Sequence, residues 1–241
     1  MAKLIKQNNN LLKNVGIIMD GNGRWALKNS FKVSEGHKRG VNVVRKIVEE
    51  SVKQEIKSLT LYAFSSENWK RPKTEINAIK KLIINAIDDQ SQELKEQKVK
   101  LRFFGDIENF GEKIVNKISK VESETNCKNS RLDLNVALGY GGQQDIIEIV
   151  RNISNQILSK KLKAKDIDKK TIEKFSMVPV GDIDLLIRTG GDKRVSNFLL
   201  FQIAYAEIMF IDKFWPDFSV EDYKNCLHSF KKASRRFGKR I

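Results

Sequence analysis

The stretch VGIIMDGNGRW, residues 15–25, is the strongest indication of the fold. It is apolar and of strand length up to Asp20, and a glycine-rich turn follows at once. Five further apolar segments of strand length follow, at 59–64, 101–104, 132–138, 184–187 and 206–211. They alternate with longer helical patterns, which is typical of a mostly parallel sheet covered by helices. We therefore predict one α/β domain whose central sheet has about six strands.

The spacing of apolar residues predicts the principal helices. A helix over 39–54 places four apolar residues on one face: Val43, Val44, Ile47 and Val48. A long amphipathic helix over 73–98 has a continuous apolar side made of Ile76, Ile79, Leu82, Ile83, Ala86 and Ile87. A final helix is predicted to begin near Val220.

Polar clusters follow three of the predicted strands at their carboxyl ends. They are residues 20–24, 65–71 and 188–191. In open parallel sheets, ligands bind at the edge where the carboxyl ends of the strands lie. We therefore expect the three clusters to contribute to a ligand site.

The first cluster has the chemistry of an anion and metal site. Gly21 and Gly23 let backbone N–H groups approach an anion closely, and Arg24 adds a charge-assisted donor. Asp20, at the end of the strand, is suited to a hard cation such as Mg²⁺, which bridges phosphates. The same residues also fit a plain tight turn, because Asp-Gly and Asn-Gly favour hairpins. This cluster alone leaves both interpretations open.

The second cluster, residues 65–72, combines dense polar side chains with an aromatic residue and a proline. A solvated loop rarely needs a residue such as Trp69, which favours a rigid loop at a functional site. The alternative is a helix start, in which Asn68 or Thr74 caps the long helix.

The third cluster places Arg188 and Arg194 on either side of a glycine pair, with Ser196 close by. Two guanidinium groups around a flexible turn make a second diphosphate cradle, although an ordinary basic loop fits as well. Glu207 follows in the apolar run 203–210, where a carboxylate is costly to bury unless it is paired or bound to metal. It fits equally well at a strand end, pointing outward.

The composition limits the class of protein without deciding it. The net charge of +15 attracts nucleic acid, phosphorylated small molecules and anionic membrane surfaces alike. Two cysteines in no metal-ligand spacing, and two histidines, argue against a disulfide framework and a zinc centre. No signal peptide and no apolar run of about 18 residues is present, so we expect a soluble, cytoplasmic protein.

Taken together, the clusters resemble the cis-prenyltransferase family, and within it the bacterial undecaprenyl diphosphate synthases. The similarity extends from about Val15 to Phe237. It is carried by GIIMDGNGRWA (16–26), GHKRG (36–40), LTLYAFSSENWKRP (59–72), LNVALGYGG (134–142), DLLIRTGGDKRVSNFLLFQIAYAE (184–207) and FWPDF (214–218).

The resemblance implies an enzyme that uses Mg²⁺ to condense isopentenyl diphosphate onto an allylic diphosphate, farnesyl diphosphate. The implied product is a long-chain polyprenyl diphosphate, undecaprenyl diphosphate for the cell-wall lipid carrier. It also implies a single domain over 1–241 with flexible tails at 1–14 and about 235–241, and an apolar tunnel beside the long helix. We further expect a homodimer whose interface is formed by the strand-and-helix region after Arg194. We also expect transient contact with the inner membrane surface and no nucleic-acid partner.

The resemblance also assigns residues to roles. Asp20 and Asn68 are the implied catalytic residues, and Asp20 and Glu207 the implied magnesium ligands. The allylic diphosphate would be held by Gly21, Asn22, Gly23, Arg24, Trp25, His37 and Arg71. Isopentenyl diphosphate would be held by Arg188, Arg194, Val195 and Ser196. Ser65, Ser66, Glu67 and Trp69 would line the reacting centre with Asn68.

Two positions depart from the family pattern. The family usually has an arginine where Val33 stands. Its absence here removes one diphosphate contact unless Lys32 replaces the arginine. A histidine is expected where Lys193 stands, and a lysine at that position can still neutralise phosphate.

Three other classes of function agree less well with the sequence. A trans-prenyl synthase would carry Asp-Asp-x-x-Asp, but Asp88-Asp89 is followed by Gln-Ser-Gln. A non-catalytic relative is disfavoured, because Asp20, Asn68 and Glu207 are all retained. A nucleic-acid binder is motivated by the charge alone, since no zinc-finger, RNP-like or helix-turn-helix pattern is evident.

Overall fold

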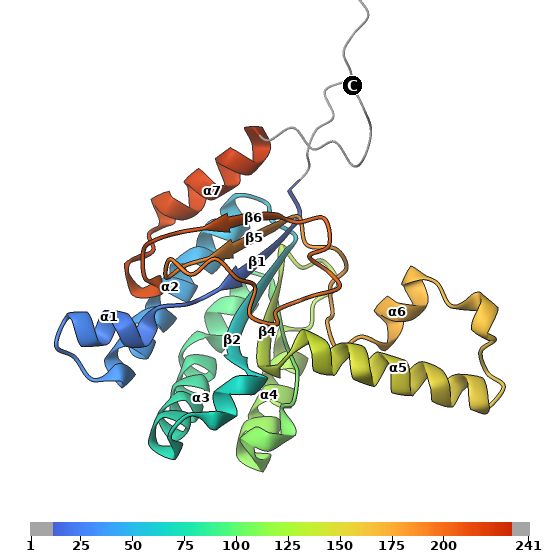
Figure 1. Cartoon of the computed structure of the whole chain (residues 1–241). Helices are drawn as coiled ribbons and strands as arrows, with labels where there is room; N and C mark the ends of the chain where they lie inside the picture. The colour runs from blue at the N-terminus through green and yellow to red at the C-terminus, as the bar shows by residue number, and fades with distance from the viewer. Residues whose placement is uncertain (1–11, 233–241) are drawn as a thin grey trace, which may run out of the picture.

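The computed structural model describes residues 12–232, in which six parallel strands form one sheet (Figure 1). The strands are β1 (Asn14–Ile18), β2 (Ser58–Ser65), β3 (Val99–Phe104), β4 (Leu132–Tyr140), β5 (Leu185–Arg188) and β6 (Glu207–Phe210). Their order in the sheet is β3-β4-β2-β1-β5-β6, and every neighbouring pair is parallel. The predicted α/β fold with a parallel central sheet is therefore confirmed.

Helices connect the first five strands, as is usual in a parallel sheet, whereas the connection from β5 to β6, residues 189–206, contains no helix. The helices are α1 (Asn22–Lys28), α2 (Val33–Lys53), α3 (Lys73–Glu96), α4 (Glu112–Thr125), α5 (Gly142–Leu158), α6 (Lys169–Phe175) and α7 (Val220–Lys232). Short 3₁₀ helices lie at η1 (Ser66–Lys70), η2 (Glu108–Phe110), η3 (Ala164–Asp166) and η4 (Trp215–Asp217). Unlike the other helices, α5 and α6 extend away from the sheet as an arm (Figure 1).

The central strands are buried on both faces, which explains their continuous apolar sequences. On β1, Ile17 packs into a core formed with α2, α3, α4 and α7. The next residue, Ile18, packs on the opposite face in a second cluster with Leu186 and Phe198. Alternate residues therefore serve two cores, because successive side chains of a strand point to opposite faces.

The strand register brings the three polar clusters to one edge of the sheet. Ile18 of β1 pairs with Tyr62 of β2 on one side and with Arg188 of β5 on the other. Asp20 lies two residues beyond Ile18, and Ser65, the last residue of β2, lies three residues beyond Tyr62, so both stand at the carboxyl edge just past the level of Arg188. The carboxyl edge of the sheet is the expected ligand edge.

Two boundaries differ from those predicted. Helix α2 begins at Val33, six residues before the predicted start at 39, because its first turns pack through the buried Gly36 and Gly40 and show no apolar periodicity. The predicted N-terminal tail, 1–14, overlaps the fold, since Leu12 is buried and Asn14 begins β1. The remainder of that tail and the tail at 235–241 lie outside the described residues.

Candidate active site

A cavity of about 660 Å³ lies at the carboxyl edge of the sheet, beside β1, β2 and β5. It brings together residues from all three polar clusters and one from α2. The predicted site residues that line it are Asp20, Gly21, Asn22, Gly23, Arg24, His37, Ser65, Glu67, Asn68, Arg71, Arg188, Arg194 and Ser196. Most of the site residues inferred from the sequence therefore line one cavity.

Four other predicted site residues are close in sequence but do not line the cavity. Trp25 is buried, and its indole N–H donates to Asp217 Oδ1 at 2.7 Å. Trp69 packs in the core against Phe64 and Phe110, with ring centroids 4.8 Å away in both cases. Ser66 and Val195 also lie behind the cavity wall, and the Ser66 hydroxyl is buried without a hydrogen-bond partner.

Glu207, predicted as a further magnesium ligand, does not line the cavity of the same chain. It opens β6, whose last residue, Phe210, is the one that pairs with Arg188. Three residues of strand separate Glu207 from that level, about 10 Å. Within one chain Glu207 thus lies toward the opposite edge of the sheet. This position agrees with the alternative of a carboxylate at a strand end, and the role of Glu207 as a magnesium ligand stays a prediction.

The centre of the cavity is a network of carboxylates and guanidinium groups. Asp20 Oδ2 accepts a hydrogen bond from Arg188 Nη2 at 2.8 Å and pairs with Arg24 Nη2 at 3.0 Å. Asp192 Oδ2 contacts the same two arginines, at 3.6 and 3.4 Å, and Arg194 Nη2 at 2.8 Å. Arginines from two distant parts of the chain are therefore held around one carboxylate, ready for a larger anion.

Opposing effects act on the protonation of Asp20. Burial alone would raise its pKa, but the Arg188 hydrogen bond and the charge of Arg24 outweigh burial and lower the pKa below its ordinary value. Asp20 is consequently ionised at neutral pH. An ionised carboxylate is the form that a divalent cation requires.

The two motifs at this centre fit together through a glycine. Gly190 has a φ of 92°, and a Cβ there would lie 2.7 Å from Arg24 Nη2 and 3.2 Å from the Asp20 carboxyl carbon. Only glycine allows both this backbone conformation and the close approach. The pair Gly190-Gly191 thus lets the loop after β5 lie directly on the cluster after β1.

Asn68 is held in a defined orientation by the turn that follows β2. Its Oδ1 accepts from the backbone N–H of Ser65 at 3.0 Å, as part of a capping box at the start of η1. The acceptor atom of the amide is therefore engaged, and its NH₂ group is the part available for donation. This geometry suits a residue that orients an oxygen-rich ligand.

His37 lies at the cavity wall between two charged residues. Its Nε2 is 3.6 Å from Glu75 Oε1, and Glu75 also pairs with Arg71 at 2.9 Å. Burial, followed by the charge of Arg71, lowers the pKa of His37, and Glu75 only partly opposes this. The imidazole is therefore neutral at pH 7.

We expect an NMR titration of His37 to give a midpoint below 6.5, its ordinary value. Glu75→Gln should lower the midpoint further, because it removes the charge that favours the imidazolium. Since the unfolded chain binds this proton at a higher pH than the folded chain does, the free energy of unfolding should decrease as the pH falls below 6.5. A midpoint at or above 6.5 would contradict this placement of His37.

Three residues near the cavity were missed by sequence reasoning. Asp192 and Asn197 lie within a quoted motif, but their side-chain types gave no signal beyond a polar loop. Glu75 lies in the first turn of α3, where an acidic residue is expected for the helix dipole alone. The structure shows each of them paired to a predicted site residue.

An apolar cavity of about 160 Å³ adjoins the polar one. The two share Met19, Asn22, His37 and Ala63, and the apolar cavity then runs between α2, α3 and the sheet. The α3 side is formed by Ile79, Leu82, Ile83, Ala86 and Ile87. These residues belong to the apolar side of the long helix recognised in the sequence. A chain attached to an anion in the polar cavity has an apolar region next to it.

The donor set fits Mg²⁺ better than a protein-bound transition metal. In residues 12–232, no three His, Cys, Asp or Glu side chains converge as a metal cluster. Mg²⁺ commonly binds through one or two carboxylates together with substrate phosphates and water. The Asp20 contacts with Arg24 and Arg188 use Oδ2, which leaves Oδ1 as a ligand oxygen in a cavity lined by four arginines.

Comparisons with known proteins identify the family. The family model described as "Putative undecaprenyl diphosphate synthase" matches residues 18–238. The chain belongs to the cis-prenyltransferase family. It is 44% identical over 227 residues to a farnesyl-diphosphate-specific ditrans,polycis-undecaprenyl-diphosphate synthase of Salmonella typhimurium, covering 94% of this chain and 90% of the relative. The identity with the Escherichia coli K12 enzyme of the same name is 43%, covering 94% and 89%.

Solved structures of other cis-prenyltransferases have the same fold. Lavandulyl diphosphate synthase from Lavandula x intermedia, in complex with dimethylallyl diphosphate, superposes with a TM-score of 0.90 at 32% identity, covering 93% of this chain and 97% of that one. The "probable undecaprenyl diphosphate synthase" of Campylobacter jejuni gives 0.78 at 33% identity, covering 95% and 99%. The family predicted from the sequence motifs is therefore confirmed.

Proposed function

We propose that this cis-prenyltransferase condenses isopentenyl diphosphate onto farnesyl diphosphate and repeats the step to make a long-chain product, undecaprenyl diphosphate. The observation that carries the proposal is the meeting of two arginine-bearing loops on one carboxylate, Asp20, in a cavity that adjoins an apolar one. Two diphosphates need two cationic binding sites, and a growing isoprenoid chain needs an apolar cavity.

The allylic diphosphate fits the half of the cavity formed by Gly21–Arg24, His37 and Arg71. Arg24 is 45% exposed and donates from the start of α1, so it can turn from the carboxylates to a diphosphate. Mg²⁺ held by Asp20 would supply positive charge that neutralises a diphosphate leaving group. Neither Val33 nor Lys32 lines the cavity, so the proposal assigns no diphosphate contact to Lys32.

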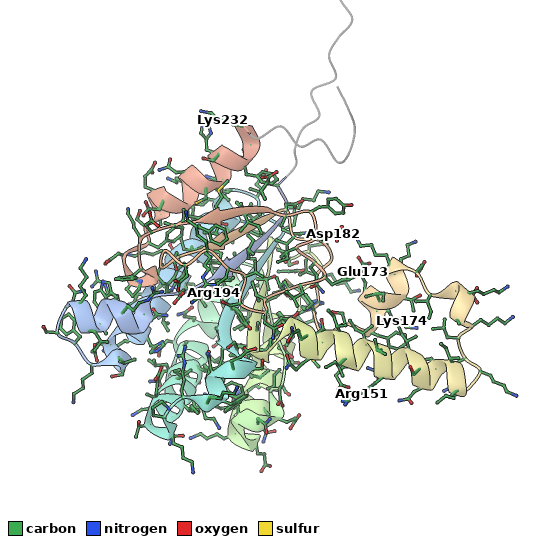
Figure 2. All side chains as sticks on the ribbon, in the orientation of Figure 1. Arg151, Glu173, Lys174, Asp182, Arg194 and Lys232 are labelled. Atoms are coloured by element: carbon green, nitrogen blue, oxygen red, sulfur yellow. The ribbon has the colours of Figure 1, made fainter. Side chains whose placement is uncertain are left out.

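Isopentenyl diphosphate fits the half formed by Arg188, Arg194 and Ser196. Arg188 is only 4% exposed, and its Nη1 donates to Ser196 Oγ at 2.7 Å, so its guanidinium group is fixed in place. Arg194 lies on the loop after β5 (Figure 2), and its side chain is 63% exposed. In the proposal it is therefore free to close over a ligand. Lys193 is exposed and does not line the cavity, so the proposal gives it no role.

The proposed reaction breaks the allylic C–O bond and forms a C–C bond to the terminal alkene carbon of isopentenyl diphosphate. A proton then leaves C2 of the isopentenyl unit. Arg24 stabilises the charge that grows on the departing diphosphate. Asn68 orients the substrates through its NH₂ group; a neutral amide whose oxygen is already bonded is a poor base, which favours a diphosphate oxygen as the proton acceptor.

The apolar cavity beside α3 is the proposed path of the growing chain. Ala86→Phe should shift the products toward shorter chains, because a larger side chain fills the cavity. The rate of the first condensation should be unchanged, since the diphosphate cradles are untouched. Chromatography of dephosphorylated products measures both effects. Asn85→Phe, at an exposed neighbouring position of α3, is the matched control; equal products from both variants would contradict this path.

We also propose that the enzyme is a homodimer. Ile146, Ile147 and Val150 are 41%, 48% and 58% exposed on α5, and Ile208 is 39% exposed on the edge strand β6. Exposed apolar patches of this kind mark association surfaces. Ile208 belongs to the region after Arg194 that is expected at the interface, and α5 begins at Gly142, whose N–H donates to the Asn197 oxygen of that region.

Light scattering should therefore give twice the chain mass for the wild type. Ile147→Lys combined with Val150→Lys should give a monomer, because two charges would be buried in the interface. Arg151→Lys, on the same helix, keeps a positive charge at position 151. It is the control and should give the same mass as the wild type. A monomeric wild type would contradict the homodimer.

We expect the enzyme to work in the cytoplasm and to contact the inner membrane surface when its apolar product leaves. No helix within residues 12–232 has the length and apolar character of a membrane span. Leu27 and Phe31 are 71% and 52% exposed next to Lys28 and Lys32, which suits transient contact with an anionic surface.

Incubation of the purified protein with labelled isopentenyl diphosphate, farnesyl diphosphate and Mg²⁺ tests the function. The proposal predicts incorporation into a butanol-soluble product, and chromatography then gives its length. No incorporation would favour a non-catalytic relative of the family.

A further inference from the structure

The loop that carries the proposed isopentenyl diphosphate cradle is conformationally strained. Ser196, Asn197 and Leu199 have φ values of 45°, 62° and 47°, in the left-handed region that non-glycine residues rarely adopt. Such residues persist only where surrounding contacts hold them, and they concentrate at functional sites. The contacts that hold this loop are therefore of interest for function.

Asn197 makes the contacts that join this loop to two other elements. Its Nδ2 donates to Glu67 Oε1 at 3.0 Å and to Gln144 Oε1 at 3.2 Å. Its Oδ1 accepts from the backbone N–H of Gln143 at 2.8 Å, and its backbone oxygen accepts from Gly142 N at 2.7 Å. One side chain thus connects the loop after β5, the turn after β2 and the start of α5.

The junction is closely packed. A Cβ on Gly141 would lie 2.3 Å from Gln144 Oε1, 2.6 Å from Ser66 Oγ and 2.7 Å from Asn197 Nδ2. The absence of a side chain at Gly141 is what lets the three segments meet. None of the roles assigned to site residues above involves this junction.

We propose that Asn197 is a positioning residue that fixes the distance between the Arg188–Ser196 loop and the Ser65–Asn68 turn. The inference rests on the proposed function, because those two segments hold isopentenyl diphosphate and line the reacting centre. Ser196 precedes Asn197 directly, and Glu67 precedes Asn68 directly. A shift at the junction therefore moves a diphosphate ligand and an orienting amide relative to each other.

Asparagine meets the demands of this position. It tolerates the left-handed region better than most residues, and its amide both donates and accepts. Burial would raise the pKa of Glu67, yet the Asn197 hydrogen bond and other local bonds lower it, so Glu67 faces Asn197 as a carboxylate. An aspartate at 197 would keep the bond from Gln143 N but would set two carboxylates against each other.

The test compares Asn197→Asp in two backgrounds. In the wild-type background it should lower kcat/KM for isopentenyl diphosphate about 10- to 100-fold, through a raised KM, with the KM for farnesyl diphosphate unchanged. In the Glu67→Gln background the added loss should be at least about tenfold smaller, because the amide can donate to the new carboxylate. Lys160→Gly, at another exposed left-handed position at the far end of α5, controls for backbone effects and should change neither KM.

A merely structural role would give a different pattern. It would lower kcat in proportion to the folded fraction, leave both KM values unchanged, and give the same loss in both backgrounds. That result, or no loss at all, would overturn the proposal.

Hydrogen exchange tests the junction without relying on activity. Asn197→Gly keeps the backbone conformation accessible but removes the side chain, so amide exchange should rise in both 65–70 and 188–199. Wild-type protein that fails to incorporate isopentenyl diphosphate would overturn the proposed function, and the exchange result would still decide the junction. Unchanged amide exchange in residues 65–70 of Asn197→Gly would overturn the proposed role of Asn197 at the junction.

Discussion

Asp20→Ala should lower kcat by at least about 10³-fold while leaving the chain folded. Asp20 is the carboxylate on which both arginine-bearing loops converge, and the residue that would hold Mg²⁺ against the diphosphates. Its loss removes the metal ligand and also the anion that positions Arg24 and Arg188. Steady-state incorporation of labelled isopentenyl diphosphate measures the effect.

The fold should survive this substitution, because the side chain of Asp20 is 28% exposed and its arginine partners also contact Asp192. We expect the free energy of unfolding to fall by at most about 2 kcal/mol. Asp166→Ala, on the exposed η3 segment, is the matched control and should retain full activity. An unfolded Asp20→Ala protein, or one of nearly normal activity, would show that Asp20 has a different role.

Arg188→Lys is expected to have the second largest effect, a loss of about 10²-fold in kcat/KM with a raised KM for isopentenyl diphosphate. Arg188 is buried at the end of β5, and its two terminal nitrogens bridge Asp20 and Ser196. Lysine keeps the charge but cannot make both bonds from one planar group. Initial rates at varied isopentenyl diphosphate and fixed farnesyl diphosphate separate KM from kcat.

The control for this variant is Arg131→Lys, an exposed arginine before β4, which should leave both constants unchanged. A raised KM for farnesyl diphosphate instead would mean that Arg188 serves the other cradle. An unaltered Arg188→Lys enzyme would remove the reason for placing a second diphosphate at this loop.

The fold was predictable because its determinants are local. Each strand of the sheet is a short apolar run, and α3 shows its apolar side in the spacing from Ile76 to Ile87. The early start of α2 was missed because its packing there uses glycines, which carry no apolar signal. Helix α1 was missed because the residues after Asp20 fit a turn equally well.

The cavity was predictable to the extent that it depends on strand ends. Any polar cluster after a parallel strand lies at the carboxyl edge of the sheet. This rule predicted that Asp20, Ser65 and Arg188 lie close together. Side-chain direction was not predictable: Trp69 packs in the core, and Trp25 contacts Asp217 and Phe31 and does not line the cavity. For Glu207 the sequence left two positions open, because a short apolar run does not reveal whether its carboxylate is buried or lies at a strand end.

The central claim is that two diphosphates share the cavity around Asp20. The most direct measurement is a crystal structure with Mg²⁺, isopentenyl diphosphate and the non-reactive farnesyl thiodiphosphate. We predict one diphosphate against Arg24 and the other against Arg188, Arg194 and Ser196, with the metal on Asp20. Diphosphates bound on separate faces of the molecule, or a metal without Asp20 as a ligand, would contradict the account.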